Sequence, residues 1–230
     1  GLGQLFVICR QAQQTAAMLA LNEDRLMSER IAEQSNLVKA ENIEQLLWRL
    51  TLDLPQILDS QIDLAPYKEF RGFAAQQVQS KRFDAKAKQK LAWYADKAFW
   101  QLTGLDAKSF LQLSSGQLEH WFAGSSLMAK AFNCLPYTSP AGHYVRENQP
   151  LPPIPDESLG RQLIDAMLSQ NDFCEQPSLQ GVTPSTGPLS YVCQHPHMQA
   201  QSSQNAPTLN CFLLARIVYL AEQIGQVANI

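Results

Sequence analysis

One cysteine near the N-terminus is the residue of this chain best placed to do chemistry. Cys9 follows an apolar run and precedes a stretch rich in Ala, Gln, Leu and Met, which favours a helix. Amides at a helix N-terminus stabilise a thiolate and lower the pKa of the thiol, and thiolates bind soft metal ions. The same place in the chain also suits a small buried apolar side chain. Cys9 is therefore a candidate metal ligand or a core residue.

A second candidate lies near the C-terminus, in the run Cys193-Gln194-His195-Pro196-His197. Alternate residues of an extended strand share a face, so a C-x-H-x-H set is able to converge on a metal ion. The spacing is short for a metal site, however, and the chain has no second cluster of ligands. Phosphate-binding loops, dinucleotide fingerprints and nucleophile elbows are absent from the sequence.

The third candidate is the stretch Ser185-Thr186-Gly187-Pro188-Leu189. Its glycine and proline favour a turn that leads into the final helix.

Helices must position most of these residues. We expect them over about 9–21, 24–53, 66–80, 84–103, 156–169 and 208–227, with two short helices between 105 and 135 that are broken near Gly116 and Gly124. One face of the second helix carries apolar residues at helical spacing, namely Met27, Ile31, Val38, Leu46, Leu50 and Leu54. Pro55 should end that helix, because the residue before a proline disfavours helical geometry. Asp84 is the expected N-cap of the fourth helix and Gly104 its C-terminal stop.

Proline and glycine concentrate in 136–155 and 171–207, which we expect to be long irregular loops. The sequence therefore predicts a mainly α fold, a long-helix bundle with Pro/Gly-rich loops, in a single domain over residues 1–230. The first residue is Gly1 rather than methionine, so we expect a longer natural protein that is truncated at its N-terminus.

Composition narrows the classes of function. The chain has 230 residues, 45% of them hydrophobic, and a net charge of -3, so it has no global basic field to attract nucleic acid. No apolar run is long enough for a membrane span, and no secretory signal is apparent. Five scattered cysteines do not suggest a disulfide scaffold. We expect reduced thiols and a cytoplasmic protein.

Cys9, the long helix that contains 39–54 and the Thr186–Gly187 loop occur in an order that resembles the large subunit of nickel–iron hydrogenases. The chain is more closely similar to its non-catalytic relatives, the HupK/HoxV-type hydrogenase maturation proteins. A catalytic large subunit has a second cysteine where Ala12 stands. The C-terminal cysteine pair is also missing, since Leu214 follows Cys211 at the position of the second thiol. Ser185 and Tyr191 stand where relatives carry a glutamate and an arginine.

The resemblance implies the helical core of the large subunit without its N-terminal β portion, and an accessory protein rather than an enzyme. Relatives are thought to hold an iron–dicyanide–carbonyl unit temporarily. By resemblance, Cys9 is the metal ligand, Thr186 and Gly187 bind the unit, and nickel is absent. Cys9 and Gly187 should then approach within roughly 10–12 Å across one pocket.

The implied partners are a small HypC-type chaperone and the precursor of the hydrogenase large subunit, with no nucleic acid and no membrane. Two alternatives stay open. One is a divergent large subunit that retains some metal chemistry. The other is an inactive homologue that acts as a metal-free helical interaction module, in which Cys9 is a core residue.

Overall fold

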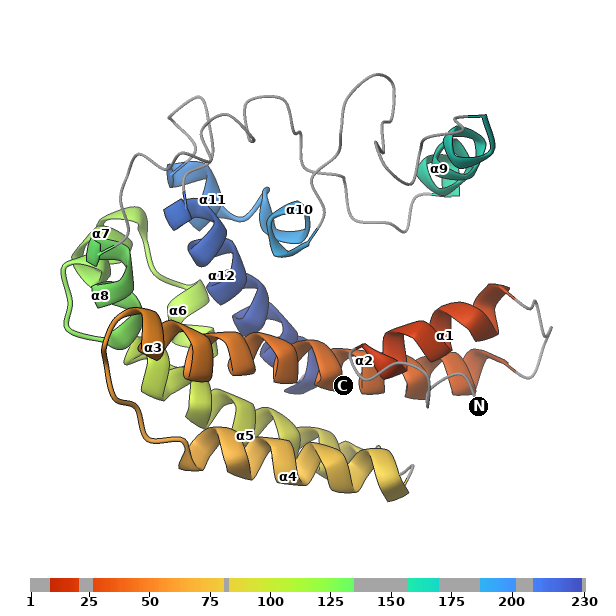
Figure 1. Ribbon diagram of the computed structural model, residues 1–230, viewed down its shortest axis with the longest axis horizontal. Helices are drawn as coiled ribbons and strands as arrows, with labels where there is room; N and C mark the ends of the chain where they lie inside the picture. The colour runs from red at the N-terminus through yellow and green to blue at the C-terminus, as the bar shows by residue number, and fades with distance from the viewer. Residues whose placement is uncertain are drawn as a thin grey trace. The chain divides into compact units, whose positions relative to one another are not determined.

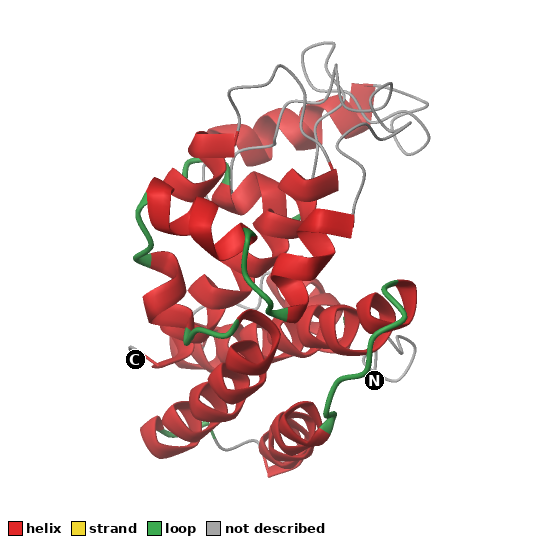
Figure 2. Cartoon of the chain, turned by 90° about the vertical axis from the view of Figure 1, so that its left-hand side faces the viewer, coloured by secondary structure: helices red, strands yellow, loops and turns green. Residues whose placement is uncertain are grey.

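A computed structural model describes residues 9–20, 27–80, 83–134, 157–169, 187–201 and 209–228. Its described elements are all helical (Figure 1). They are α1 (Arg10–Ala20), α2 (Met27–Trp48), a π-helical turn (Arg49–Asp53), α3 (Leu54–Ile57), α4 (Ala65–Ser80), α5 (Ala85–Thr103), α6 (Ala107–Leu111), α7 (Ser115–Phe122), α8 (Leu127–Cys134), α9 (Glu157–Ser169), α10 (Pro188–Val192), α11 (Pro196–Gln201) and α12 (Leu209–Ala228). The predicted mainly α fold is confirmed for these residues, which include no strand (Figure 2).

The chain divides into two compact units. The N-terminal unit comprises Gly1–Leu113, Gly124–Ala131 and Leu220–Ile230, and the second unit comprises Ser114–Ala123 and Phe132–Tyr219. Helices α8 and α12 contribute residues to both units.

In the N-terminal unit, α4 and α5 pack side by side, and α2 packs against both of them and against α1 (Figure 1). The core between these helices contains large side chains that are fully buried, among them Ile43, Leu47, Phe70, Leu91, Phe99 and Leu102. Because α2 has neighbours on several sides, its buried face is wider than the predicted stripe. Leu46, Leu50 and Leu54 are buried as predicted, and Leu37, Ala40, Ile43 and Leu47 are buried as well.

The ends of α5 follow the local signals in the sequence. The Asp84 carboxylate accepts a hydrogen bond of 2.7 Å from the backbone N–H of Ala87, which caps the start of the helix. At the other end Gly104 has φ 77°, a left-handed conformation that a residue without Cβ adopts at little cost, and donates its N–H to the carbonyl of Trp100. Both predicted boundaries are confirmed.

The predicted stop at Pro55 is wrong, because the helical chain continues through this proline to Ile57. In an α-helix the ring of Pro55 would clash with the carbonyl four residues earlier and leave it without a donor. The π-helical turn Arg49–Asp53 widens the helix just before the proline and accommodates this defect. The chain leaves the helix at Asp59, which has φ 48°, and the Ser60 N–H bonds to the carbonyl of Pro55 at 2.8 Å.

Three short helices rather than two lie between residues 105 and 135, and Gly116 does not break them. Ser114 and Gln117 form a capping box at the start of α7, each side chain bonding to the backbone N–H of the other. Gly116 sits inside this capped first turn. Gly124, the other predicted break, does lie between α7 and α8.

The predicted loop 171–207 contains two helices, α10 and α11, which each begin at a proline. Proline suits the first turn of a helix, because the backbone N–H groups there have no acceptor within the helix and the N–H that proline lacks is not needed. The residues 136–155 of the other predicted loop lie outside the described part of the chain.

By length and composition alone, the stretch Asn210–Ala228 of α12 is apolar enough to cross a membrane, which the sequence analysis did not anticipate. However, 61% of this stretch is buried inside the protein. That burial is typical of a core helix, and Leu214, Ile217 and Leu220 are fully buried there.

Candidate functional site

Cys9 is the residue that directly precedes α1. Its carbonyl accepts the N–H of Gln13 at 2.9 Å, so its backbone already belongs to the first helical turn. Its φ is 57°, an uncommon left-handed conformation for a residue with a side chain. Cys9 is partly buried. The structure therefore places Cys9 directly before a helix, as predicted.

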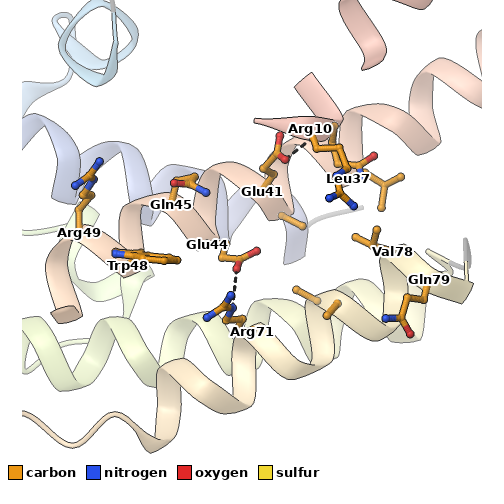
Figure 3. Close-up of a pocket in the computed structure, with 14 residues that line it drawn as sticks. Arg10, Leu37, Glu41, Glu44, Gln45, Trp48, Arg49, Arg71, Val78 and Gln79 are labelled. Atoms are coloured by element: carbon orange, nitrogen blue, oxygen red, sulfur yellow. Dashed lines mark hydrogen bonds and ion pairs between the residues drawn. The ribbon is translucent and has the colours of Figure 1, made fainter. Parts of the chain in front are cut away.

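A carboxylate from α2 caps the head of α1. The two side-chain oxygens of Glu41 accept the backbone N–H groups of Gln11 and Ala12, at 3.0 and 3.1 Å. Figure 3 shows the Glu41 side chain directed from α2 towards the start of α1. These are amides that would otherwise be free to stabilise an anion at the helix N-terminus. Glu41 therefore ties α1 to α2 and occupies donors that the sequence analysis assigned to a Cys9 thiolate. Thirty residues separate the cap from the helix, so no local pattern could reveal it.

An open groove of about 620 Å³ lies beside this helix head, between α1, α2 and α4 (Figure 3). We call it the Arg10 groove. Its apolar residues are Leu37, Ala40, Ala74, Ala75 and Val78, and its polar and aromatic residues are Arg10, Gln11, Glu41, Glu44, Gln45, Trp48, Arg49, Arg71 and Gln79. All of these residues belong to the N-terminal unit.

Most charges of the Arg10 groove are paired. Arg71 lies 3.2 Å from the Glu44 carboxylate, and its guanidinium also lies over the ring of Trp48, 5.5 Å from the ring centroid. Burial raises the pKa of Glu44, an effect that the charge of Arg71 opposes and that of Glu41 increases. Arg49 pairs with Asp53 at 2.6 Å.

Arg10 differs from the other cations of the groove, because it makes no ion pair with any described residue. It directly follows Cys9 in the chain. The residue that precedes α1 is therefore a cysteine, and the first residue of the helix is an arginine with no ion-pair partner among the described residues. A thiolate binds soft metal ions and a guanidinium binds anions, so these two residue types suit a metal unit with anionic ligands.

Of the third candidate stretch, Gly187, Pro188 and Leu189 lie in the described part of the chain, and Ser185 and Thr186 lie outside it. Gly187 has φ 106° and ψ -164°, a conformation that is essentially restricted to glycine, and it precedes Pro188 at the start of α10. Leu189 is buried. Gly187 thus forms a turn into α10 rather than into the final helix. It belongs to the second unit and Cys9 to the first, so their predicted approach stays a prediction.

The C-x-H-x-H run does not present a ligand set. Pro196 begins α11, so these residues wind into a helix and do not alternate along an extended strand. The Nδ1 atom of His195 accepts the backbone N–H of His197 at 3.2 Å, which commits that nitrogen to capping the helix. Among the residues that the structure describes, no group of three potential metal ligands occurs, here or at Cys9.

The same hydrogen bond makes this helix sensitive to pH. Burial, together with the neighbouring His197, lowers the pKa of His195 from 6.5 to about 4. Protonation of His195 would place a proton on Nδ1, the atom that accepts the backbone N–H of His197. It would also place a positive charge beside the positive end of the helix dipole.

We therefore expect acid to weaken the fold through His195. The pKa of His195 is lower in the folded state, so the unfolded state binds the proton first as the pH falls. The contribution of neutral His195 to the free energy of unfolding is therefore fully present above about pH 6.5. It is lost as the pH drops towards 4. The pKa shift limits the loss in the free energy of unfolding to at most about 3 kcal/mol. Solvent around the half-buried ring screens the effect and reduces it to roughly 1–2 kcal/mol. Comparing urea unfolding near neutral pH with urea unfolding near pH 4 measures this loss of stability.

His195→Asn keeps a capping oxygen but does not titrate, so this variant should lose less stability in acid than the wild type. His120→Asn, at an exposed position, is the matched control and should behave like the wild type. Equal acid sensitivity of wild type and His195→Asn would contradict the role given to His195.

Comparison with known proteins adds no relative: no family model, no curated protein and no solved structure matches this chain.

Proposed function

We propose that this chain is an accessory protein of nickel–iron hydrogenase maturation. In this proposal it is a cytoplasmic scaffold, not an enzyme, and it transiently carries the iron–dicyanide–carbonyl unit destined for the large subunit. Its partners are a HypC-type chaperone, which delivers the unit, and the large-subunit precursor, which receives it. The support comes from the order of Cys9, the long helix and the glycine loop in the sequence.

The observation that carries the proposal is that Cys9 and Arg10 follow one another at the N-terminus of α1. Cys9 is partly buried, and Arg10 has no counter-ion among the described residues. An iron(II) ion already bound by two cyanides and a carbonyl needs few further ligands, and the unit carries a negative charge once a thiolate is added. One thiolate would ligate it and one guanidinium would balance its charge.

A resident nickel–iron centre fits this chain poorly. Such a centre needs several thiolates, because soft ligands bind these metals best, whereas Cys9 has Ala12 in place of its partner. A single protein ligand instead suits a cargo that must be released to another protein. In this proposal Thr186 and Gly187 contact the cargo, and their approach to Cys9 is part of the proposal.

A second candidate function is a metal-free helical interaction module. The observation that favours it is the Glu41 cap, because a carboxylate already fills the amide donors at the head of α1. In that case Cys9 merely begins a helix, and the open grooves of the N-terminal unit serve to bind partner proteins.

Metal analysis of protein purified without oxygen separates these functions. A scaffold should contain iron but no nickel, and it should show no hydrogen uptake. Stoichiometric nickel from nickel-replete cells would contradict the scaffold and favour a divergent large subunit. Absence of both metals, in cells that assemble active hydrogenase, would favour the interaction module.

A further inference from the structure

A second groove of about 540 Å³ lies in the N-terminal unit, between α5, α6 and the last turns of α12. We call it the Trp93 groove. Its small residues include Ala92, Ala107 and Ala221, which are buried, and Gly225 of α12, which is partly exposed. A Cβ atom built on Gly225 would meet nothing within 4 Å, so the space above this helix is open. Small side chains allow the backbone of another chain to approach closely.

Trp93 forms one wall of the groove and is 58% exposed. Its indole packs edge-on against Tyr94, with ring centroids 4.9 Å apart, and Lys97 lies 5.7 Å from its ring centroid. These contacts fix the position of the indole on the helix and leave most of its surface uncovered. A large aromatic side chain held in this way is typical of the residues that dominate protein–protein binding.

Asp96, one turn further along α5, is one of three charged residues that line the groove, with Asp106 and Lys108. One carboxylate oxygen accepts the backbone N–H of Ala107 at 2.7 Å, and Asp96 makes no ion pair with any described residue. Burial raises the pKa of Asp96, the Ala107 hydrogen bond opposes this effect, and the nearby Asp106 adds to it.

Asp106 itself is already satisfied, because both of its oxygens accept hydrogen bonds from Ser109 at the start of α6. Lys108 also lines the groove, but it forms no ion pair with Asp96. Folding thus buries part of a carboxylate beside an exposed indole without supplying its counter-charge. Such an arrangement costs stability, which points to a role in binding.

We propose that the Trp93 groove binds a basic, partly apolar segment of a partner protein, which places an arginine or lysine against Asp96 and an apolar side chain against Trp93. The cation supplies a charge that Asp96 does not receive from any described residue. The indole supplies apolar contact area, and the small residues of α12 admit the backbone of the segment. An acidic segment would be repelled by Asp96 and Asp106. This proposal goes beyond the carrier function and depends on neither Cys9 nor iron.

A displayed library of short random segments, selected on the full chain, tests the proposal. Recovered segments should carry arginine or lysine close to an aromatic or aliphatic residue. Their binding should weaken at least about tenfold on Trp93→Ala, on Asp96→Asn, and when the basic residue of the segment is changed to glutamine.

Two variants are matched controls. Trp100→Ala removes an indole that is 60% exposed on the same helix but does not line the groove. Glu119→Gln neutralises an exposed carboxylate of the second unit. Both should bind the recovered segments like the wild type.

Asp96→Asn should also unfold at higher urea than the wild type at neutral pH. The folded-state pKa of Asp96 is raised, so the ionised carboxylate costs stability there, and the amide oxygen still accepts the Ala107 N–H. Weaker binding by a more stable variant separates lost recognition from lost folding. No enrichment, enrichment of acidic or uncharged segments, or undiminished binding to the Trp93 and Asp96 variants would overturn the proposal.

Discussion

Phe99→Ala is expected to lower the free energy of unfolding by about 3–5 kcal/mol, the largest stability effect that we predict. Phe99 is fully buried in the last turns of α5, and its ring meets that of Phe110 edge-on, with centroids 5.7 Å apart. Alanine would leave a cavity between α5 and α6 and remove this aromatic contact. Urea unfolding followed by far-ultraviolet circular dichroism measures the loss.

The neighbouring residue provides the control. Trp100 is 60% exposed, so Trp100→Ala should change the free energy of unfolding by no more than about 0.5 kcal/mol. Similar losses of stability for the two variants would show that α5 does not bury Phe99 and expose Trp100 as described.

Cys9→Ser is expected to have the largest effect on function. If Cys9 carries the iron unit, the serine variant should leave hydrogenase activity at the level of cells without this protein, because a neutral hydroxyl is a poor ligand where a thiolate is needed. The measurement is hydrogen uptake in cells that contain only the variant. Serine is nearly isosteric, so α1 should keep its Glu41 cap.

The other cysteines provide controls for this experiment. Cys134 is exposed and Cys211 is buried, and the serine variant at either position should still support maturation. Full maturation with Cys9→Ser would remove Cys9 from the mechanism.

The sequence predicted helices where local chemistry decides the structure. Asp84 and Gly104 bound α5 as expected, since a capping carboxylate and a left-handed glycine act within a single turn. Pro55 misled the prediction, because a π-helical turn lets the helix pass through it. Pro188 and Pro196 misled it in the opposite sense, because each begins a short helix inside a stretch predicted to be irregular.

The candidate site was predictable only in part. Apolar spacing and composition placed Cys9 at a helix start. Packing of α1 against α2 supplied the Glu41 cap, and packing of α5 against α6 supplied the Asp96 contact. These contacts join residues that are distant in sequence, so periodicity and capping patterns carry no trace of them.

Infrared spectroscopy tests the central claim most directly, because cyanide and carbonyl stretches lie where proteins do not absorb. The chain should be purified without oxygen from cells that are assembling active hydrogenase, alongside the Cys9→Ser variant. We predict cyanide and carbonyl bands in the wild-type protein and their loss in the variant. Absence of these bands from the wild type, or their persistence in Cys9→Ser, would contradict the proposal that this chain carries the iron unit on Cys9.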